Sequence, residues 1–197
     1  MAVPYGDLGL GDFLDLVAKR QPAPGGGAVA AVSVSSAASL VAMAGRYSTG
    51  CLDGAEELVD EAERLRVRAV CLADDDATAY GEVIAAHASV RQGDGTVGRA
   101  DVRAALTRAA EVPLEVAELG AATARLAALL VAEGKRDIRG DAATALLLAE
   151  AATLAAAHLV AINVKAGGGD EDLLGRARRS AASARQSAAS VRSAAGQ

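Results

Sequence analysis

Three consecutive aspartates, Asp74, Asp75 and Asp76, lie in the middle of a long segment that contains no proline. Apolar residues alternate there at four- and three-residue spacing, which predicts a helix with a buried seam, and Asp76 occupies a seam position. Burial and repulsion between neighbouring carboxylates both raise an aspartate pKa toward the range used in general acid–base catalysis. The pattern therefore predicts Asp76 as a proton-transfer group, with Tyr80 one turn away to bond it or to stack on a flat ligand. The alternative is a buried aspartate satisfied by a helix N-terminus or an arginine.

A second apolar stretch contains three further polar residues. Asp141 stands at the head of its seam, where it either contributes to a site or caps the helix. Asn163 lies between Ile162 and Val164, and a buried asparagine commonly fixes the register between helices. His158 has no second histidine or cysteine beside it, which favours a packed core residue over a ligand.

Three glycines, Gly25, Gly26 and Gly27, open another predicted helix, which comes earlier in the chain, within the sequence PAPGGGAVAA. Free backbone N–H groups and the positive end of the helix dipole can hold an anion there, and glycine lets a ligand approach closely. The turn lacks the Lys-Ser/Thr of a nucleotide-binding P-loop and does not follow a G-x-G-x-x-G pattern. Neither a G-x-S-x-G elbow nor an H-E-x-x-H motif occurs elsewhere in the chain.

The elements that must position these residues are helices. The chain has 197 residues, is rich in alanine, contains no tryptophan and is 2% aromatic, so helices lined with Ala, Leu and Val must approach closely. We expect an all-α, up-and-down bundle of five or six helices that dimerises through helix packing. Pro113 should bend one helix. The expected helices cover residues 7–20, 25–50, 53–87, 97–131 and about 137–165, with turns at 91–95 and 167–169.

The remainder of the chain differs in composition. We divide the sequence into a helical domain, residues 1–168, and an Ala/Ser/Arg-rich segment, residues 169–197. From Gly175 onward that segment has no acidic residue, and SAASARQ is followed by the near-repeat SAASVRS. Such low-complexity sequence is compatible with a solvated helix, with a frayed tail or with a patch for an anionic ligand.

Charge and cysteine content exclude several functional classes. A net charge of −5 argues against a nucleic-acid partner, which would need a basic face. Cys51 and Cys71 are too few for a metal site or a disulfide framework, so we expect buried, reduced thiols in a cytoplasmic protein. No signal peptide is visible at the N-terminus. Residues 25–45 carry no charge and are long enough to cross a bilayer, but their Ala, Gly, Val and Ser content favours a buried bundle helix over a membrane partner.

A set of segments resembles the formiminotetrahydrofolate cyclodeaminase / methenyltetrahydrofolate cyclohydrolase family. The opening FLDLVAKRQPAPGGGAVAAVSVSSAASLVAMAGRYS is similar to the first part of that family. The segments CLADDDATAY, AAEVPLEVAEL and GDAATALLLAEAATLAAAHLVAINVKA follow in the family's order. The resemblance covers about residues 10–168.

The resemblance implies an all-helical homodimer that binds a tetrahydrofolate derivative as substrate in a cleft at the interface. No cofactor is permanently bound and no metal is needed. One family reaction closes 5-formiminotetrahydrofolate to 5,10-methenyltetrahydrofolate with loss of ammonia; the other hydrates the methenyl bridge toward 10-formyltetrahydrofolate. Asp76 is implied as the proton shuttle and Asp74 as the second catalytic candidate. The implied substrate-binding residues are Pro24, Gly25, Gly26, Gly27, Arg46, Tyr80, Asp141 and Asn163, with Arg46 or the C-terminal arginines pairing with glutamate carboxylates.

Three positions depart from the family pattern. Ala28 replaces a common serine, Lys135 replaces an asparagine after Gly134, and Leu159 replaces an asparagine. These departures motivate an alternative: a non-catalytic helical module that binds folate or a protein partner and retains the fold. A membrane-associated helical protein is a weaker third hypothesis. The absence of a fused formiminotransferase domain within 197 residues tilts the expectation slightly toward the cyclohydrolase role.

Overall fold

The computed structural model describes residues 3–92 and 98–195, with side chains up to residue 192 apart from residue 190. Within those residues it contains six α-helices and two short 3₁₀ helices and has no strand, which confirms the predicted all-α class. The elements are η1 (Tyr5–Asp7), α1 (Leu10–Ala18), α2 (Gly26–Ser48), α3 (Ala55–Gln92), α4 (Arg99–Glu133), η2 (Arg136–Ile138), α5 (Arg139–Gly167) and α6 (Glu171–Ala195).

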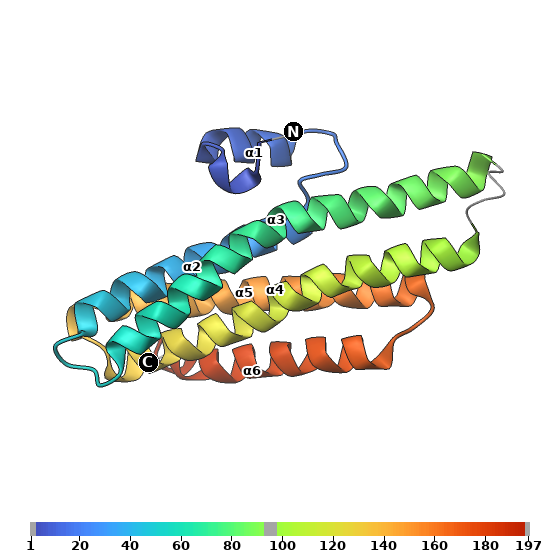
Figure 1. Cartoon of the computed structure of the whole chain (residues 1–197). Coiled ribbons are helices and arrows are strands. Elements are labelled where there is room, and N and C mark those ends of the chain that lie inside the picture. Colours follow the sequence, from blue (N-terminus) through green and yellow to red (C-terminus); the bar gives the residue numbers. More distant parts are fainter. Residues whose placement is uncertain (1–2, 93–97, 196–197) are drawn as a thin grey trace.

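Helices α2 to α5 form the bundle, and α6 covers the α4–α5 pair (Figure 1). Alanine dominates the buried positions, so the helix axes lie close together. Added side-chain atoms at the contacts between helices would therefore clash. Gly120 illustrates the spacing, because a Cβ atom there would lie 2.3 Å from the Thr153 hydroxyl on α5. Pro113 lies inside α4, which continues as one helix on both sides of it.

Helix α2 is much shorter than its neighbour α3, with 23 residues against 38. Figure 1 shows α3 and α4 extending well past the point where α2 begins. The chain from Lys19 to Gly25 enters the bundle there, after α1, which lies beside the bundle with only Phe13 buried. The bundle is therefore missing the continuation of one helix at that level.

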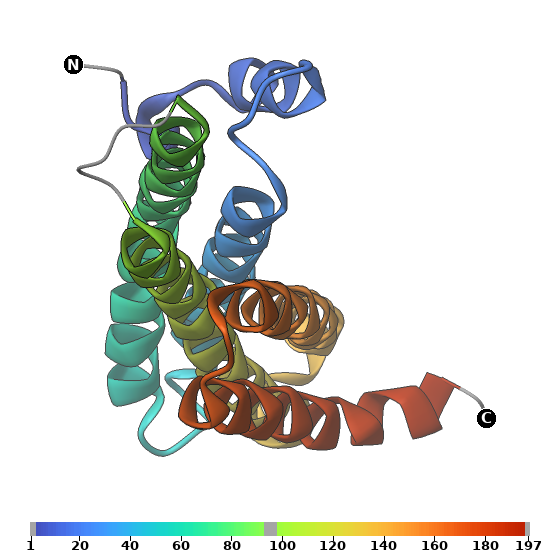
Figure 2. The same cartoon turned by 90° about the vertical axis from the view of Figure 1, so that its right-hand side faces the viewer.

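The C-terminal segment 171–195 is helical and packs on the bundle. Ala177, Ala181, Ala184 and Ala188 are buried against the rest of the protein. Arg192 pairs with the buried carboxylate of Glu150 on α5. Figure 2 shows this helix and α1 at opposite edges of the α2–α5 side of the molecule.

Three expectations are wrong, two about burial and one about where a helix ends. Cys51 and Cys71 are free thiols, as expected, but both are exposed rather than buried. His158 is exposed on α5 and is not a packed core residue. The third helix runs on to Gln92, so Arg91 and Gln92 belong to it; the rest of the turn expected at 91–95 falls outside the described residues.

Two helical stretches are long and apolar enough to cross a membrane by length and composition, Gly26–Ser48 and Arg136–Gly167. About half of the most apolar window of each is buried inside the bundle, 56% and 44% respectively. Their apolar character thus serves the core of the bundle on one side and leaves an apolar outer face on the other.

Candidate active site

A cavity of about 310 Å³ opens at the start of α2, where the bundle lacks the continuation of that helix. Small-molecule sites generally occupy about 300–1,000 Å³. Five segments contribute to its walls: the entering loop, the start of α2, α3, α4 and α5. The lining residues are Pro22, Ala23, Gly25, Gly26, Gly27, Asp76, Tyr80, Ala109, Leu159, Ile162 and Asn163.

Asp76 is half-buried on the cavity wall and is held by the backbone of α2. Its Oδ2 accepts a hydrogen bond of 3.1 Å from the N–H of Ala28. The contact is possible because residue 27 is glycine: a Cβ atom there would lie 1.9 Å from Asp76 Oδ1. Burial raises the pKa of Asp76, and the Ala28 hydrogen bond offsets part of that rise. The alternative drawn from the sequence, a carboxylate held by a helix N-terminus, is therefore correct about the partner of Asp76. The same carboxyl nevertheless also lines a cavity.

The other two aspartates point elsewhere, because successive residues on a helix are rotated by about 100°. Asp74 accepts a 3.0 Å hydrogen bond from the backbone N–H of Tyr5, and Asp75 pairs with Arg68 at 3.0 Å. Neither lines the cavity. Burial, rather than the expected repulsion by these neighbours, is the cause that raises the pKa of Asp76.

Tyr5, from the N-terminal segment, lies near Asp74 and Asp76. Burial raises the pKa of its phenol, and the charges of Asp74 and Asp76 raise it further. The hydrogen bond from the backbone N–H of Tyr5 to Asp74 thus places the N-terminal segment next to the part of α3 that contains Asp76. No motif in the sequence indicated this contact.

The first turn of α2 presents backbone donors to the cavity. The helix begins after Gly25, and no side chain caps it. Only the Ala28 N–H is used by Asp76, and the N–H of Val29 bonds to the Gly25 carbonyl. The N–H groups of Gly26 and Gly27 have no helical acceptor, as is general for a first turn. Gly26 has open space where a Cβ would stand, so only Gly27 is required sterically.

Asn163 enters the cavity from α5. Its Nδ2 donates a hydrogen bond of 2.7 Å to the carbonyl of Ala109 on α4, so it does join two helices, as the register interpretation expects. Leu159 and Ile162 flank it within one turn of α5 and form an apolar wall, and Tyr80, which is 48% exposed, contributes a ring from α3. Leu159, Ile162 and Ala109 were not predicted as lining residues, although Leu159 and Ile162 have the helical spacing that would have found them.

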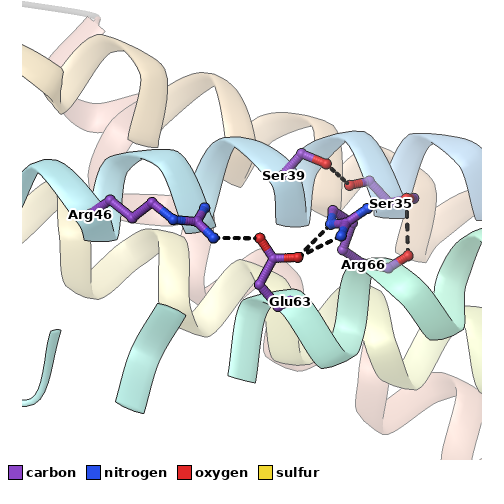
Figure 3. Close-up of polar contacts among 5 residues, drawn as sticks. All are labelled: Ser35, Ser39, Arg46, Glu63 and Arg66. Atoms are coloured by element: carbon purple, nitrogen blue, oxygen red, sulfur yellow. Dashed lines mark hydrogen bonds and ion pairs between the residues drawn. The ribbon is translucent and has the colours of Figure 1, made fainter. Parts of the chain in front are cut away.

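Besides Asp74, three substrate-binding residues implied by the resemblance are not on the cavity wall. Pro24 belongs to the entering loop but is buried and does not line the cavity. Asp141 is exposed in the first turn of α5, neither in a seam nor bonded as a helix cap. Arg46 lies near the other end of α2, where it contacts Glu63 of α3 at 2.8 Å (Figure 3). Nineteen residues of helix separate it from Gly27, roughly 28 Å at 1.5 Å per residue.

Glu63 is held between two arginines in that second cluster. Arg46 comes from α2 and Arg66 from α3, and both bond to its carboxylate (Figure 3). These hydrogen bonds lower the pKa of Glu63. Ser35 completes the contact between the helices by donating to the carbonyl of Arg66. The Glu63 carboxylate is therefore paired and stays ionised to a lower pH than an ordinary glutamate.

The chemistry available in the cavity is proton transfer beside a bound organic molecule. Asp76 is a carboxyl group whose pKa is raised, the α2 first turn and Asn163 supply hydrogen bonds, and the remaining wall is largely apolar. Within residues 3–92 and 98–195, no group of three or more His, Cys, Asp or Glu side chains is arranged to hold a metal ion.

Comparison with known proteins agrees with the predicted family. The family model described as formiminotransferase-cyclodeaminase matches residues 9–183. A methenyltetrahydrofolate cyclohydrolase of Methylorubrum extorquens is 30% identical over 161 residues, covering 78% of this chain and 77% of the relative. The crystal structure of a formiminotetrahydrofolate cyclodeaminase from Thermotoga maritima superposes with a TM-score of 0.79 at 26% identity, covering 94% of this chain and 98% of the other. The chain belongs to the formiminotransferase-cyclodeaminase family of folate one-carbon enzymes.

Proposed function

We propose that this protein hydrolyses 5,10-methenyltetrahydrofolate to 10-formyltetrahydrofolate, with Asp76 as the group that moves the proton. The observation that carries the proposal is the half-buried carboxyl of Asp76, held by the Ala28 N–H on the wall of a cavity large enough for a small molecule. The cyclohydrolase among its relatives, at 30% identity, supports this reaction.

The proposed reaction is an addition followed by an elimination at one carbon. Water adds to the cationic carbon between N5 and N10, and the Asp76 carboxylate takes one of its protons. The bond from this carbon to N5 then breaks, N5 receives the proton from Asp76, and the hydroxyl proton is released as the formyl group forms on N10. The sum is one water consumed and one proton released. A carboxyl with a raised pKa suits both steps, because the raised pKa makes the carboxylate a stronger base for the first step and the carboxyl then returns the proton in the second.

The second candidate is the cyclodeaminase reaction, which the structural relative supports. N10 attacks the formimino carbon on N5, Asp76 takes the N10 proton, and the same carboxyl returns it to the departing amine, which leaves as ammonia after a further proton is taken up. Both reactions pass through a carbon bearing N5, N10 and one heteroatom. The same residues therefore serve either one, and a carboxyl group suffices without a resident cofactor.

The departures from the family pattern bear on a non-catalytic alternative. Ala28 lacks the hydroxyl of the expected serine but keeps the backbone N–H that bonds Asp76. Leu159 replaces an amide on the cavity wall and makes the wall more apolar. The proton-transfer group is therefore retained, which favours an enzyme over a binding module.

One assay separates these possibilities. The absorbance of methenyltetrahydrofolate is followed with purified protein, starting from methenyltetrahydrofolate and, separately, from 5-formiminotetrahydrofolate. We expect the absorbance to decay faster than in buffer in the first reaction. Growth of the absorbance in the second reaction alone would assign the cyclodeaminase activity instead. Folate binding by calorimetry without turnover in either reaction would assign the non-catalytic module.

We also propose a homodimer formed through the outer faces of α2 and α5. These helices lie side by side, with α1 and α6 at the edges of the face (Figure 2). The face exposes apolar side chains: Val29, Leu147, Leu148 and Ile162. If α2 runs antiparallel to α2 of the second copy, the end carrying Arg46 approaches the partner's cavity. Arg46 and Asp141 would then join the site from the neighbouring subunit.

A charge placed on this face tests the dimer. Leu148→Glu should convert the dimer to a monomer at micromolar concentration, measured by light scattering after size exclusion. Val67→Glu is the control, because Val67 is exposed to a similar degree on α3, away from that face. A wild-type protein that is monomeric at high concentration, or a variant that remains dimeric, would refute the proposed interface.

The proposed location is the cytoplasm, where thiols remain reduced. Two exposed free cysteines are compatible with that compartment. Expression followed by fractionation without detergent checks it: we expect all of the protein in the soluble fraction. Recovery in the membrane pellet would favour a membrane-associated role for the two long apolar helices.

A further inference from the structure

Pro113 in α4 leaves one backbone acceptor without its helical donor. In an α-helix the N–H of residue 113 would bond to the carbonyl of Ala109, but proline has no N–H. The Ala109 carbonyl is instead bonded at 2.7 Å by the Nδ2 of Asn163 from α5. Pro113 on α4 and Asn163 on α5 are thus linked through the carbonyl oxygen of Ala109.

This link decides which end of the Asn163 amide is available. A side-chain amide has a donor nitrogen and an acceptor oxygen, and bonding of Nδ2 to a carbonyl fixes the orientation. Among the residues that the structure describes, none donates a hydrogen bond to Asn163 Oδ1. Asn163 lines the same cavity as Asp76, so the amide presents an acceptor there.

We propose that Pro113 is a positioning residue that acts through Asn163, fixing its Oδ1 as a hydrogen-bond acceptor for a ligand N–H or O–H in the cavity. The inference rests on the proposed function for the identity of that donor. In the hydrolysis it is the attacking water, whose second hydrogen bonds to Asn163 Oδ1 while Asp76 takes the first. In the cyclodeaminase reaction it is an N–H of the formimino group.

A simple link between two helices predicts a different outcome from an oriented acceptor. If Asn163 only fixes the register of α4 and α5, its loss lowers stability and leaves turnover per folded molecule unchanged. If Pro113 orients it for chemistry, replacing the proline must alter catalysis through Asn163 alone. The effects of substituting Pro113 and Asn163 on catalysis must then be non-additive.

A double-mutant cycle measures this coupling. Pro113→Ala supplies an N–H that competes with Asn163 for the Ala109 carbonyl, and Asn163→Ala removes the amide. We expect each to lower kcat/KM by about 10- to 100-fold, the range for one positioned hydrogen bond, and the double variant to be no worse than Asn163→Ala. Multiplicative losses would overturn the proposal, because Pro113 would then act by another route. Thermal unfolding confirms that each variant is folded.

Asn163→Asp supplies a rescue test. In the native background the introduced carboxylate faces the unbonded Ala109 carbonyl and is repelled, so turnover should fall. In the Pro113→Ala background that carbonyl has its own donor, so Asn163→Asp should be tolerated better. A larger loss in the Pro113→Ala background than in the native one would contradict the proposed link.

A measurement without folate separates this inference from the proposed reaction. The Asn163 side-chain amide should give a nuclear magnetic resonance signal whose exchange with water is slow in the wild type and fast in Pro113→Ala. Fast exchange in the wild type would overturn the positioning role whatever the enzyme does. Slow exchange in a protein that converts neither folate would retain the oriented acceptor and reject the proposed reaction.

Discussion

Helix α3 presents two carboxylates to α2, and their surroundings are opposite. Asp76 is half-buried, has a raised pKa and, among the described residues, bonds only to the backbone N–H of Ala28. Glu63 lies near the other end of α2, is bonded by Arg46 and Arg66, and has a lowered pKa. The same functional group is therefore prepared to exchange a proton in one place and to remain ionised in the other. The difference comes from burial at Asp76, which raises its pKa, and from the guanidinium hydrogen bonds at Glu63, which lower its pKa.

The largest expected effect separates the two carboxylates by activity. Asp76→Asn keeps the shape and an oxygen for the Ala28 N–H but cannot take a proton, so turnover should fall by about 10²–10⁴-fold. Glu63→Gln should change turnover by less than about threefold, because it alters a partly exposed ion pair. Steady-state kinetics on both substrates measures this. Wild-type turnover by a folded Asp76→Asn protein would remove Asp76 from the mechanism.

The next effect concerns the glycine that lets Asp76 approach α2. Gly27→Ala places a Cβ atom 1.9 Å from Asp76 Oδ1, so the carboxyl must move, and kcat/KM should fall by about 10- to 100-fold. Overpacking should also lower the free energy of unfolding by about 1–3 kcal/mol. Gly26→Ala is the matched control, since its Cβ meets open space. Equal losses in the two variants would mean that backbone freedom, and not the approach of Asp76, explains the glycines.

The pH dependence of stability should have opposite signs at the two carboxylates. The folded pKa of Asp76 is above its ordinary value of 3.8, so its contribution is most favourable below that pH and is lost as the pH rises through the folded pKa. Asp76→Asn should therefore gain stability relative to wild type as the pH rises. The folded pKa of Glu63 is below its ordinary value of 4.5, so its contribution is present above 4.5 and is lost as the pH falls through the folded pKa.

Denaturant unfolding of wild type, Asp76→Asn and Glu63→Gln across this acid range measures both trends. Glu63→Gln should become less stable relative to wild type as the pH rises. Parallel curves for all three proteins would show that neither carboxylate has a different pKa in the folded and unfolded states.

The smallest expected effect tests whether the end that carries Glu63 contributes to a neighbouring site. Arg46→Gln and Glu63→Gln break the same exposed ion pair, so both should change the free energy of unfolding by less than about 1 kcal/mol. Only Arg46→Gln should raise KM for the folate, by several-fold, if Arg46 reaches the glutamate tail bound by the partner subunit. Equal KM values for the two variants would confine Arg46 to its ion pair.

The sequence predicted the all-α fold, most helix positions and a partly buried carboxyl with a raised pKa at Asp76, because a carboxylate in an apolar seam is conspicuous. It did not predict burial well, because alanine is accommodated on both the inner and the outer face of a helix. That ambiguity explains the errors at His158 and Cys71, and the placement of Asp141 in a seam. Asp74 and Asp76 differ by two helical positions, and only the three-dimensional arrangement shows which one faces the cavity. The Pro113–Asn163 link joins residues far apart in the sequence, so local patterns could not reveal it.

The position at which α2 begins has a consequence for the shape of the ligand that the site admits. The first residues of α2 form part of the cavity wall, so the size of the cavity depends on where α2 begins as well as on the side chains of the wall. Each residue added at the start of α2 would lengthen the helix by about 1.5 Å, and one full turn by about 5.4 Å. Insertions or deletions between Pro24 and Gly27 should therefore change the length of the accepted molecule, whereas substitutions at Leu159 or Ile162 should change its width.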